Sequence, residues 1–98
     1  MEAVTLVDAE NVRRSVWPNL ARDELERRVR DWGDEHGHDV IVVWEGAASA
    51  DDRIAELAEE LPPPLWIVTS DRELRSRVAH RAESVIGGGS YARDVTRS

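Results

Sequence analysis

The chain contains no cysteine, no lysine and no phenylalanine among its 98 residues. Without cysteine there can be no disulfide framework and no thiolate metal site. All 13 basic residues are therefore arginine. The chain also has 20 acidic residues, so the formal net charge is −7. This charge argues against indiscriminate binding of polyanions. If nucleic acid is the partner, bound cations and locally placed arginines must overcome the overall negative charge.

Long apolar runs are also missing. No stretch approaches the roughly 18 apolar residues that predict a membrane-spanning helix. The first residues also lack the basic lead and apolar core of a secretory signal. We therefore expect no membrane partner and a cytoplasmic location. The length predicts a single domain over residues 1–98, built around one modest core.

Short apolar segments rich in β-branched residues alternate with amphipathic ones. The predicted strands begin at Val4 and cover 40–44, 65–69 and 84–86. Continuous apolar strands of this kind are typical of parallel sheets buried on both faces. The intervening segments predict helices at 11–17 and 22–35, a third helix that Pro62 ends, and a fourth that Ser70 caps; residues 90–93 are expected to add one last helical turn.

This alternation predicts an α/β fold with right-handed crossovers between parallel strands. With the first strand central, the simplest strand order is 2-1-3-4, in three layers with helices on both faces of the sheet. The switch point then lies between strands one and three. Ligands of open α/β sheets bind at such a point, at the carboxyl ends of the strands.

Acidic residues follow three of the predicted strands. Asp8 ends the first, Glu45 follows the second, Asp71 follows the third, and Asp51 opens the helix after the second. Carboxylates gathered at one edge repel each other unless a cation is present, and oxygen ligands suit Mg²⁺ or Mn²⁺. The sequence therefore predicts a metal site formed by these four residues. Asp51 and Asp71 also fall in first helical turns, where the helix dipole favours a carboxylate whatever the function.

Further polar residues near this edge are candidates for orienting or binding a substrate. Asn11 either orients a ligand or caps a helix, and Ser70 is expected to cap a helix, since no histidine is placed to activate it as a nucleophile. Five arginines that follow the acidic edge in sequence either meet phosphates or compensate the acids; they are Arg13, Arg14, Arg53, Arg72 and Arg93. Trp17 is expected to be the most exposed of the four tryptophans. The orienting or substrate-binding candidates are Asn11, Asp52, Ser70, Arg72 and Arg13.

Four motifs in order resemble the NYN domains of the PIN-like nuclease superfamily, and in particular the YacP-like group. They are Leu6-Val7-Asp8-x-x-Asn11, Glu45-Gly46, Ala50-Asp51-Asp52-x-Ile54 and Val68-Thr69-Ser70-Asp71-Arg72. The resemblance implies a PIN-like, Rossmann-like fold and a metal-dependent ribonuclease, with Asp8, Asp51 and Asp71 at the family's catalytic acidic positions. It also implies RNA as the partner, in a ribonucleoprotein or ribosomal context. The chain departs from the family at Ala9-Glu10, where Gly-Tyr is usual, and at Glu45, where Asp is usual.

Two other classes of domain share part of this sequence pattern. A response-regulator receiver domain needs a lysine after its last strand, and the chain has none. A Toprim domain needs a later Asp-x-Asp, which would fall at Thr69-Ser70-Asp71 and fails. The remaining alternative is a catalytically inactive NYN-like module that binds RNA, a protein partner or a second copy of itself. Metal binding separates this module from an enzyme.

Overall fold

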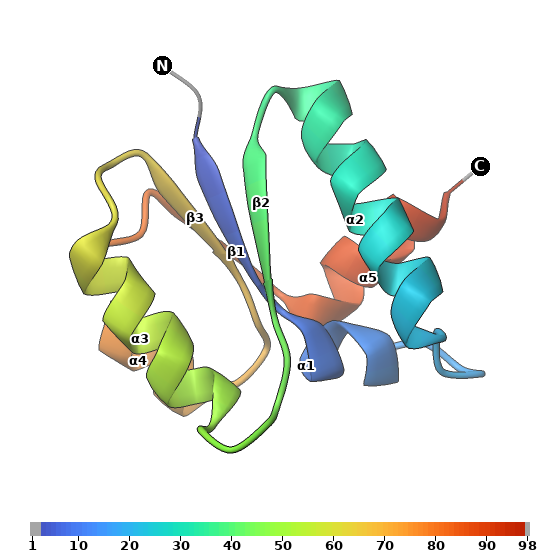
Figure 1. Cartoon of the computed structure of the whole chain (residues 1–98), viewed down its shortest axis with the longest axis horizontal. Helices are drawn as coiled ribbons and strands as arrows, with labels where there is room; N and C mark the ends of the chain where they lie inside the picture. The colour runs from blue at the N-terminus through green and yellow to red at the C-terminus, as the bar shows by residue number, and fades with distance from the viewer. Residues whose placement is uncertain (1–2, 98) are drawn as a thin grey trace.

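A computed structural model describes residues 3–97 of the chain (Figure 1). Its elements alternate along the sequence. The strands are β1 (Val4–Asp8), β2 (Asp39–Val43), β3 (Leu65–Val68) and β4 (Ser84–Ile86). The helices are α1 (Ala9–Arg14), α2 (Arg22–His36), α3 (Ala50–Glu60), α4 (Arg72–Val78) and α5 (Gly88–Thr96).

The four strands form one parallel sheet in the order β2-β1-β3-β4, which confirms the predicted topology. Leu6 of the central strand β1 is paired with Ile41 on one side and Ile67 on the other. All four carboxyl ends therefore lie at one edge, the lower edge in Figure 1. The loops that follow β1, β2 and β3 meet there.

Helices cover both faces of the sheet, so the fold has the three layers expected. α3 and α4 lie on one face and α1, α2 and α5 on the other (Figure 1). Alternate residues of β1 point to opposite faces: Leu6 packs with Ile54 of α3, while Val7 packs with Val29 of α2 and Tyr91 of α5. Each face buries its own apolar cluster, and these two clusters fix the sheet between its helices.

The end of the chain is more regular than predicted. Residues 90–93 were expected to form one turn, whereas α5 runs for nine residues from Gly88 to Thr96. Two glycines begin this helix and lower its intrinsic propensity. Burial of Tyr91, Ala92 and Val95 outweighs that cost, because an apolar stripe packed on a neighbour supplies most helical stability in proteins.

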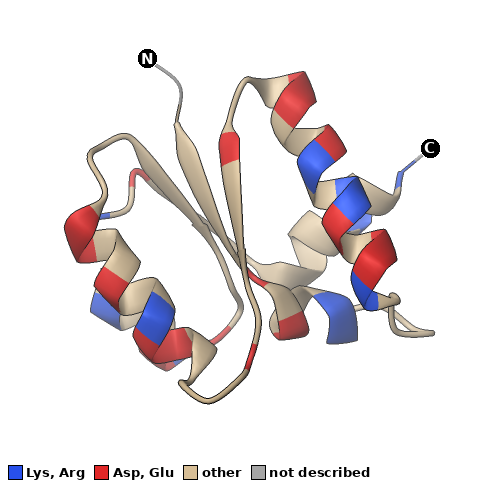
Figure 2. Cartoon of the chain, in the orientation of Figure 1, with Lys and Arg blue, Asp and Glu red and all other residues tan. Residues whose placement is uncertain are grey.

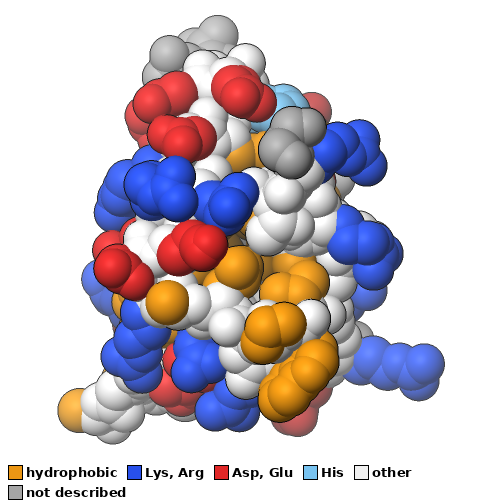
Figure 3. Space-filling view, turned by 90° about the vertical axis from the view of Figure 1, so that its right-hand side faces the viewer, with side chains coloured by type: hydrophobic (Ala, Val, Ile, Leu, Met, Phe, Trp, Pro, Cys, Tyr) orange, Lys and Arg blue, Asp and Glu red, His pale blue; other side chains and the backbone are white. Residues whose placement is uncertain are grey.

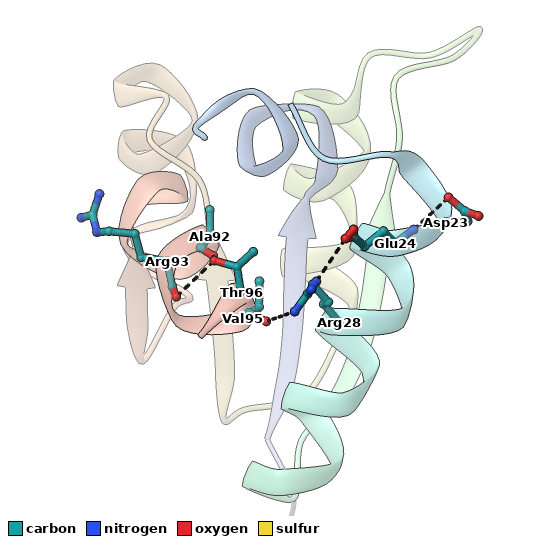
Figure 4. A network of polar contacts seen from close by, with 7 residues as sticks. All are labelled: Asp23, Glu24, Arg28, Ala92, Arg93, Val95 and Thr96. Carbon is teal, nitrogen blue, oxygen red and sulfur yellow. Dashed lines mark hydrogen bonds and ion pairs between the residues drawn. The ribbon is translucent and has the colours of Figure 1, made fainter. Parts of the chain in front are cut away.

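Polar contacts fasten α5 to α2 (Figure 4). Arg28 donates through Nη1 to the carbonyl oxygen of Val95 at 3.4 Å, and its Nε lies 3.5 Å from Glu24 Oε1. Trp32 Nε1 donates to Asp94 Oδ2 at 2.9 Å. The C-terminal helix is thus held by side chains from successive turns of α2.

The first helix is shorter than predicted. It was expected over 11–17, yet α1 begins at Ala9 and Ser15 already caps its end. The chain from Ser15 to Ala21 then forms a loop that crosses to α2 (Figure 1).

Charged residues of both signs lie along α2 and α3 (Figure 2). Among residues 3–97, no helix has the length and apolar character needed to cross a bilayer.

Candidate active site

A pocket of about 660 Å³ lies at the carboxyl edge of the sheet. Acidic segments gather at this lower edge in Figure 2. Six of the predicted site residues line the pocket, and four other residues join them. Its lining residues are Asp8, Asn11, Arg13, Glu45, Asp51 and Asp71, together with Glu10, Arg14, Ser15 and Arg22. The convergence expected from the strand ends is therefore present in the structure.

Four of the lining residues, Asp8, Glu45, Asp51 and Asp71, form what we call the acidic wall of the pocket. Asp8 lies at its centre. It is the last residue of β1, where its backbone is paired with Val43 of β2, and it is only 5% exposed. The Thr69 hydroxyl donates to Asp8 Oδ2 at 2.8 Å. One carboxylate oxygen is therefore fixed by the chain that follows β3.

Thr69 links two of the acids. It is fully buried just after β3, and its Oγ1 accepts from the backbone N–H of Asp71 at 3.1 Å while donating to Asp8. One hydroxyl thus sets the spacing between Asp8 and the start of α4. Residue-type reasoning missed this role, because Thr69 looks like an ordinary strand residue in the sequence.

Asp71 caps α4. Its Oδ1 accepts from the N–H of Leu74 at 3.0 Å, so the predicted cap at Ser70 is wrong by one residue. The Ser70 hydroxyl instead accepts from the N–H of Gly88 at 2.7 Å. Because Gly88 begins α5, this hydrogen bond connects the loop after β3 to the start of α5. A capping hydrogen bond would have joined Ser70 only to its own helix, α4.

Glu45 and Asp51 complete the acidic wall from the chain that follows β2. Glu45 Oε1 accepts from the N–H of Ala50, the first residue of α3, at 3.3 Å. Asp51 follows Ala50 in the first turn, and the helix cap is Ser49, whose hydroxyl accepts from the N–H of Asp52 at 3.1 Å. The Asp51 carboxylate is therefore not needed as a cap.

The acidic wall holds its carboxylates close together without ion pairs of their own among the described residues. Burial raises the pKa of Asp8 above its ordinary value, with further raising from Asp51, Glu45 and Asp71, while the Thr69 hydrogen bond opposes the shift. Burial also raises the pKa of Asp51, as do the charges of Asp71 and Glu45, while the charge of Arg77 opposes the shift. This crowding of negative charge destabilises the folded chain.

A divalent cation would relieve that repulsion, and the donor set suits one chemically. All four side chains offer hard oxygens of the kind that Mg²⁺ and Mn²⁺ prefer. Their arrangement is not that of a finished metal site: within residues 3–97, no three acidic or histidine side chains stand close enough together to hold an ion. The residues fit a cation by chemistry, and their carboxylates would have to draw together to bind it.

Three predicted site residues lie outside the pocket lining. Asp52 is bonded to Arg77 of α4 at 3.0 Å, and this hydrogen bond lowers its pKa. Ser70 is used by the contact with Gly88, and Arg72 is exposed at the start of α4. Asn11 does line the pocket, where its Oδ1 accepts from the N–H of Ser70 at 2.9 Å. Asn11 therefore ties α1 to the loop after β3.

The pocket is also lined by three arginines that surround Glu10, and these four residues are called the arginine wall below. Arg13, Arg14 and Arg22 lie 3.7, 3.1 and 3.5 Å from the Glu10 carboxylate. Arg13 and Arg14 had been expected from the sequence either to meet phosphates or to compensate acids, and both lie beside an acid here, whereas Arg22 had not been singled out. The i, i+3 and i, i+4 spacing of Glu10 with Arg13 and Arg14 was a signal available for α1, whereas Arg22 comes from the next helix and had none.

Comparison with known proteins bears on the fold. No family model matches the chain, and no curated protein matches it. Its structure is similar to the crystal structure of Rae1 (YacP) from Bacillus subtilis, with a TM-score of 0.81 and 24% sequence identity, over 97% of this chain and 75% of that one. At this identity the likeness shows a shared α/β fold, in agreement with the YacP-like resemblance of the sequence motifs.

Proposed function

We propose that the chain is a metal-dependent ribonuclease that hydrolyses phosphodiester bonds in RNA at the acidic pocket. The observation that carries the proposal is that four acids, none of them in a salt bridge within residues 3–97, converge on one pocket: Asp8, Glu45, Asp51 and Asp71. A structural ion-pair network would have neutralised such acids. Carboxylates left charged and crowded are the arrangement that divalent-cation sites require.

In this proposal Asp8, Asp51 and Asp71 would hold the cation, and Glu45 would complete the set. When bound, Mg²⁺ or Mn²⁺ supplies charge neutralisation and lowers the pKa of water, so no protein nucleophile is needed. Thr69 keeps Asp8 and Asp71 at a fixed separation through its two hydrogen bonds. Asn11 and Ser70 keep the surrounding loops in register.

The substrate class rests on the resemblance to NYN domains. The arginines that line the same pocket as the acids support this choice, because phosphate oxygens are good partners for guanidinium groups. The sequence contains no recognisable base-reading element, which favours delivery or positioning of the RNA within a ribonucleoprotein or ribosomal context.

The test is cleavage of a panel of single- and double-stranded RNAs by the purified chain. We expect cleavage with Mn²⁺ or Mg²⁺, none with EDTA, and a loss of at least tenfold in rate for Asp71→Asn, since a ligand's charge is removed while its capping oxygen remains. Thermal melts should also show stabilisation of the parent by Mn²⁺, about 1.4 kcal/mol when the ion is at ten times its Kd. Cleavage that persists unchanged in Asp71→Asn would identify a contaminant and refute the proposal.

The alternative is an NYN-like module that binds RNA or a protein partner without turnover. The absence, within residues 3–97, of three side chains poised around one point favours it. RNA binding without a Mn²⁺-dependent melt shift and without cleavage would establish the module in place of the enzyme.

A further inference from the structure

The arginine wall of the pocket carries more positive charge than its single carboxylate can balance. Glu10 is the shared partner of Arg13, Arg14 and Arg22, and its side chain is only 11% exposed. Each guanidinium has five N–H donors, whereas one carboxylate accepts about four hydrogen bonds. Arg13 Nε is buried and has no hydrogen-bond partner within the described part of the chain. The exposed guanidinium groups of Arg14 and Arg22 therefore retain donors for an anion, whereas the buried Nε of Arg13 is out of its reach.

Two of these arginines face solvent from fixed positions. The side chains of Arg14 and Arg22 are 71% and 64% exposed, and Arg22 also lies over the ring of Trp44, 4.9 Å from its centroid. Glu10 and Trp44 limit where these guanidinium groups can go. When a phosphate binds these two guanidinium groups it displaces water from side chains whose positions are already restricted. This restriction reduces the entropic cost of binding.

Trp17 stands on the loop that connects the two helices of this wall. It is 90% exposed, and it is the one large apolar side chain so exposed among residues 3–97. On either side of it, Val16 and Leu20 pack against the core, and the Leu20 N–H donates to the carbonyl oxygen of Arg13 at 3.3 Å. The loop is thus anchored while its indole is left in water. Figure 3 shows apolar side chains low on this face, beside arginines.

We propose that Trp17 and the arginines held by Glu10 form a binding site for single-stranded RNA next to the acidic pocket. Arg13, Arg14 and Arg22 bind the phosphates of the strand, and Trp17 stacks on one of its bases. The inference rests on the proposed function, which places the scissile phosphate over the acids a short way along the same strand. Only an unpaired strand presents base faces to an indole while its phosphates meet neighbouring guanidinium groups.

A protein partner fits this surface less well. Protein interfaces are built on an apolar core of several large residues, whereas Trp17 is the one large apolar side chain that is exposed among residues 3–97. A flat aromatic ring beside arginines is the arrangement used for single-stranded nucleic acids, because every base has a face that stacks and every linkage carries a phosphate.

The experiment measures strand binding separately from cleavage. Fluorescence anisotropy of a labelled, mixed-sequence single-stranded RNA is recorded with the full chain carrying Asp71→Asn, in Mg²⁺, and compared with a duplex of the same sequence. Adding Trp17→Ala should weaken single-strand binding about five- to a hundredfold, the loss found when one stacking residue is removed. Trp17→Phe should restore most of the affinity. Because Trp17 is exposed, the variants should melt at the same temperature as the parent.

The arginines have their own readout and a matched control. Arg14→Gln with Arg22→Gln should flatten the dependence of log affinity on log salt by roughly 1.4, about 0.7 for each lost phosphate contact with a single strand. Arg27→Gln with Arg30→Gln removes the same charge from exposed positions outside the pocket and should leave both the affinity and its salt dependence near those of the parent.

The inference is overturned if Trp17→Ala binds the single strand as tightly as the parent, if the parent binds no single strand, or if the duplex binds equally well. It is also overturned if Trp17 proves necessary for association with a second copy of the chain and not for RNA binding. A Trp17-dependent loss of affinity supports it whether or not the unsubstituted chain cleaves RNA. Failure of the proposed function is therefore distinguishable from failure of this site.

Discussion

Asp8→Asn is expected to lower metal-dependent RNA cleavage by at least about a hundredfold and, at the same time, to make the metal-free protein more stable. The first effect follows because Asp8 is the buried centre of the acidic wall. The second follows because asparagine keeps an acceptor for the Thr69 hydroxyl and removes a charge that burial and three neighbouring carboxylates disfavour. We expect a gain on the order of 1 kcal/mol, or roughly 4–8 °C in Tm for a domain of this size.

Thermal melts in EDTA and in Mn²⁺, with cleavage rates for the same preparations, measure both effects. Asp34→Asn is the matched control, because it makes the same chemical change at an exposed residue of α2 that lies outside the pocket. It should leave cleavage unchanged. If Asp8→Asn destabilised the metal-free chain, the Asp8 carboxylate would have a structural role, and the account of it as a metal ligand would be contradicted.

The same substitution has a dependence on pH. In the folded chain the pKa of Asp8 is raised above 3.8, its ordinary value, so the folded state binds the proton more tightly than the unfolded state. The destabilising charge is fully present above the folded pKa and is removed as the pH falls through it towards 3.8. The stability advantage of Asp8→Asn should therefore shrink on acidification in EDTA. An advantage that stays constant from neutral pH to pH values near 4 would contradict this account.

Gly88→Ala is expected to cost about 2 kcal/mol, within the range of roughly 1–3 kcal/mol found for overpacked sites. An added Cβ would overlap Asn11 Oδ1 and would lie 3.1 Å from Ser15 Oγ. Asn11 cannot simply move, because its Oδ1 accepts from the Ser70 N–H and its backbone carbonyl accepts from Ser15. The clash therefore falls on the junction of α1, α5 and the loop after β3.

Gly89→Ala is the control for that substitution. The two glycines are adjacent in α5, but a Cβ on Gly89 would meet only Arg93 Nη1, at an ordinary 3.7 Å. It should cost nothing and gain up to about 1 kcal/mol from helix propensity. Urea unfolding of both variants measures the difference. Equal stability of the two would show that the junction yields easily and that Asn11 does not hold the edge together.

The sequence was sufficient for the fold because its signals were local and mutually consistent. Apolar strands, proline stops and strand-end acids all indicated one parallel sheet, and its order follows from placing the first strand at the centre. The last helix was underestimated for a physical reason. Glycines at its start lower its propensity, and only packing of Tyr91 and Val95 against α2 and the sheet, which local pattern cannot show, makes it form.

The candidate site was predictable in its acids and not in the groups that position them. Asp8, Glu45, Asp51 and Asp71 each follow a strand or open a helix, so topology alone brings them together. Thr69 joins two of them through contacts that depend on rotamers and on strand register. Asp52 was predicted by proximity in sequence, yet the first turn of α3 directs it to Arg77 on the neighbouring helix.

The three loops at the carboxyl edge are joined by bonds between residues far apart in the chain. Asn11 is bonded to Ser70 across 59 positions, and Ser70 in turn to Gly88 across 18. Loop closure over such separations has an entropic cost that only a nearly complete sheet repays, and sheets of this kind fold more slowly than helical bundles. A growing or partly folded chain therefore has the acidic residues but not the pocket. In the proposed function, the hydrolytic activity would appear only once the loops that carry the acids are held together.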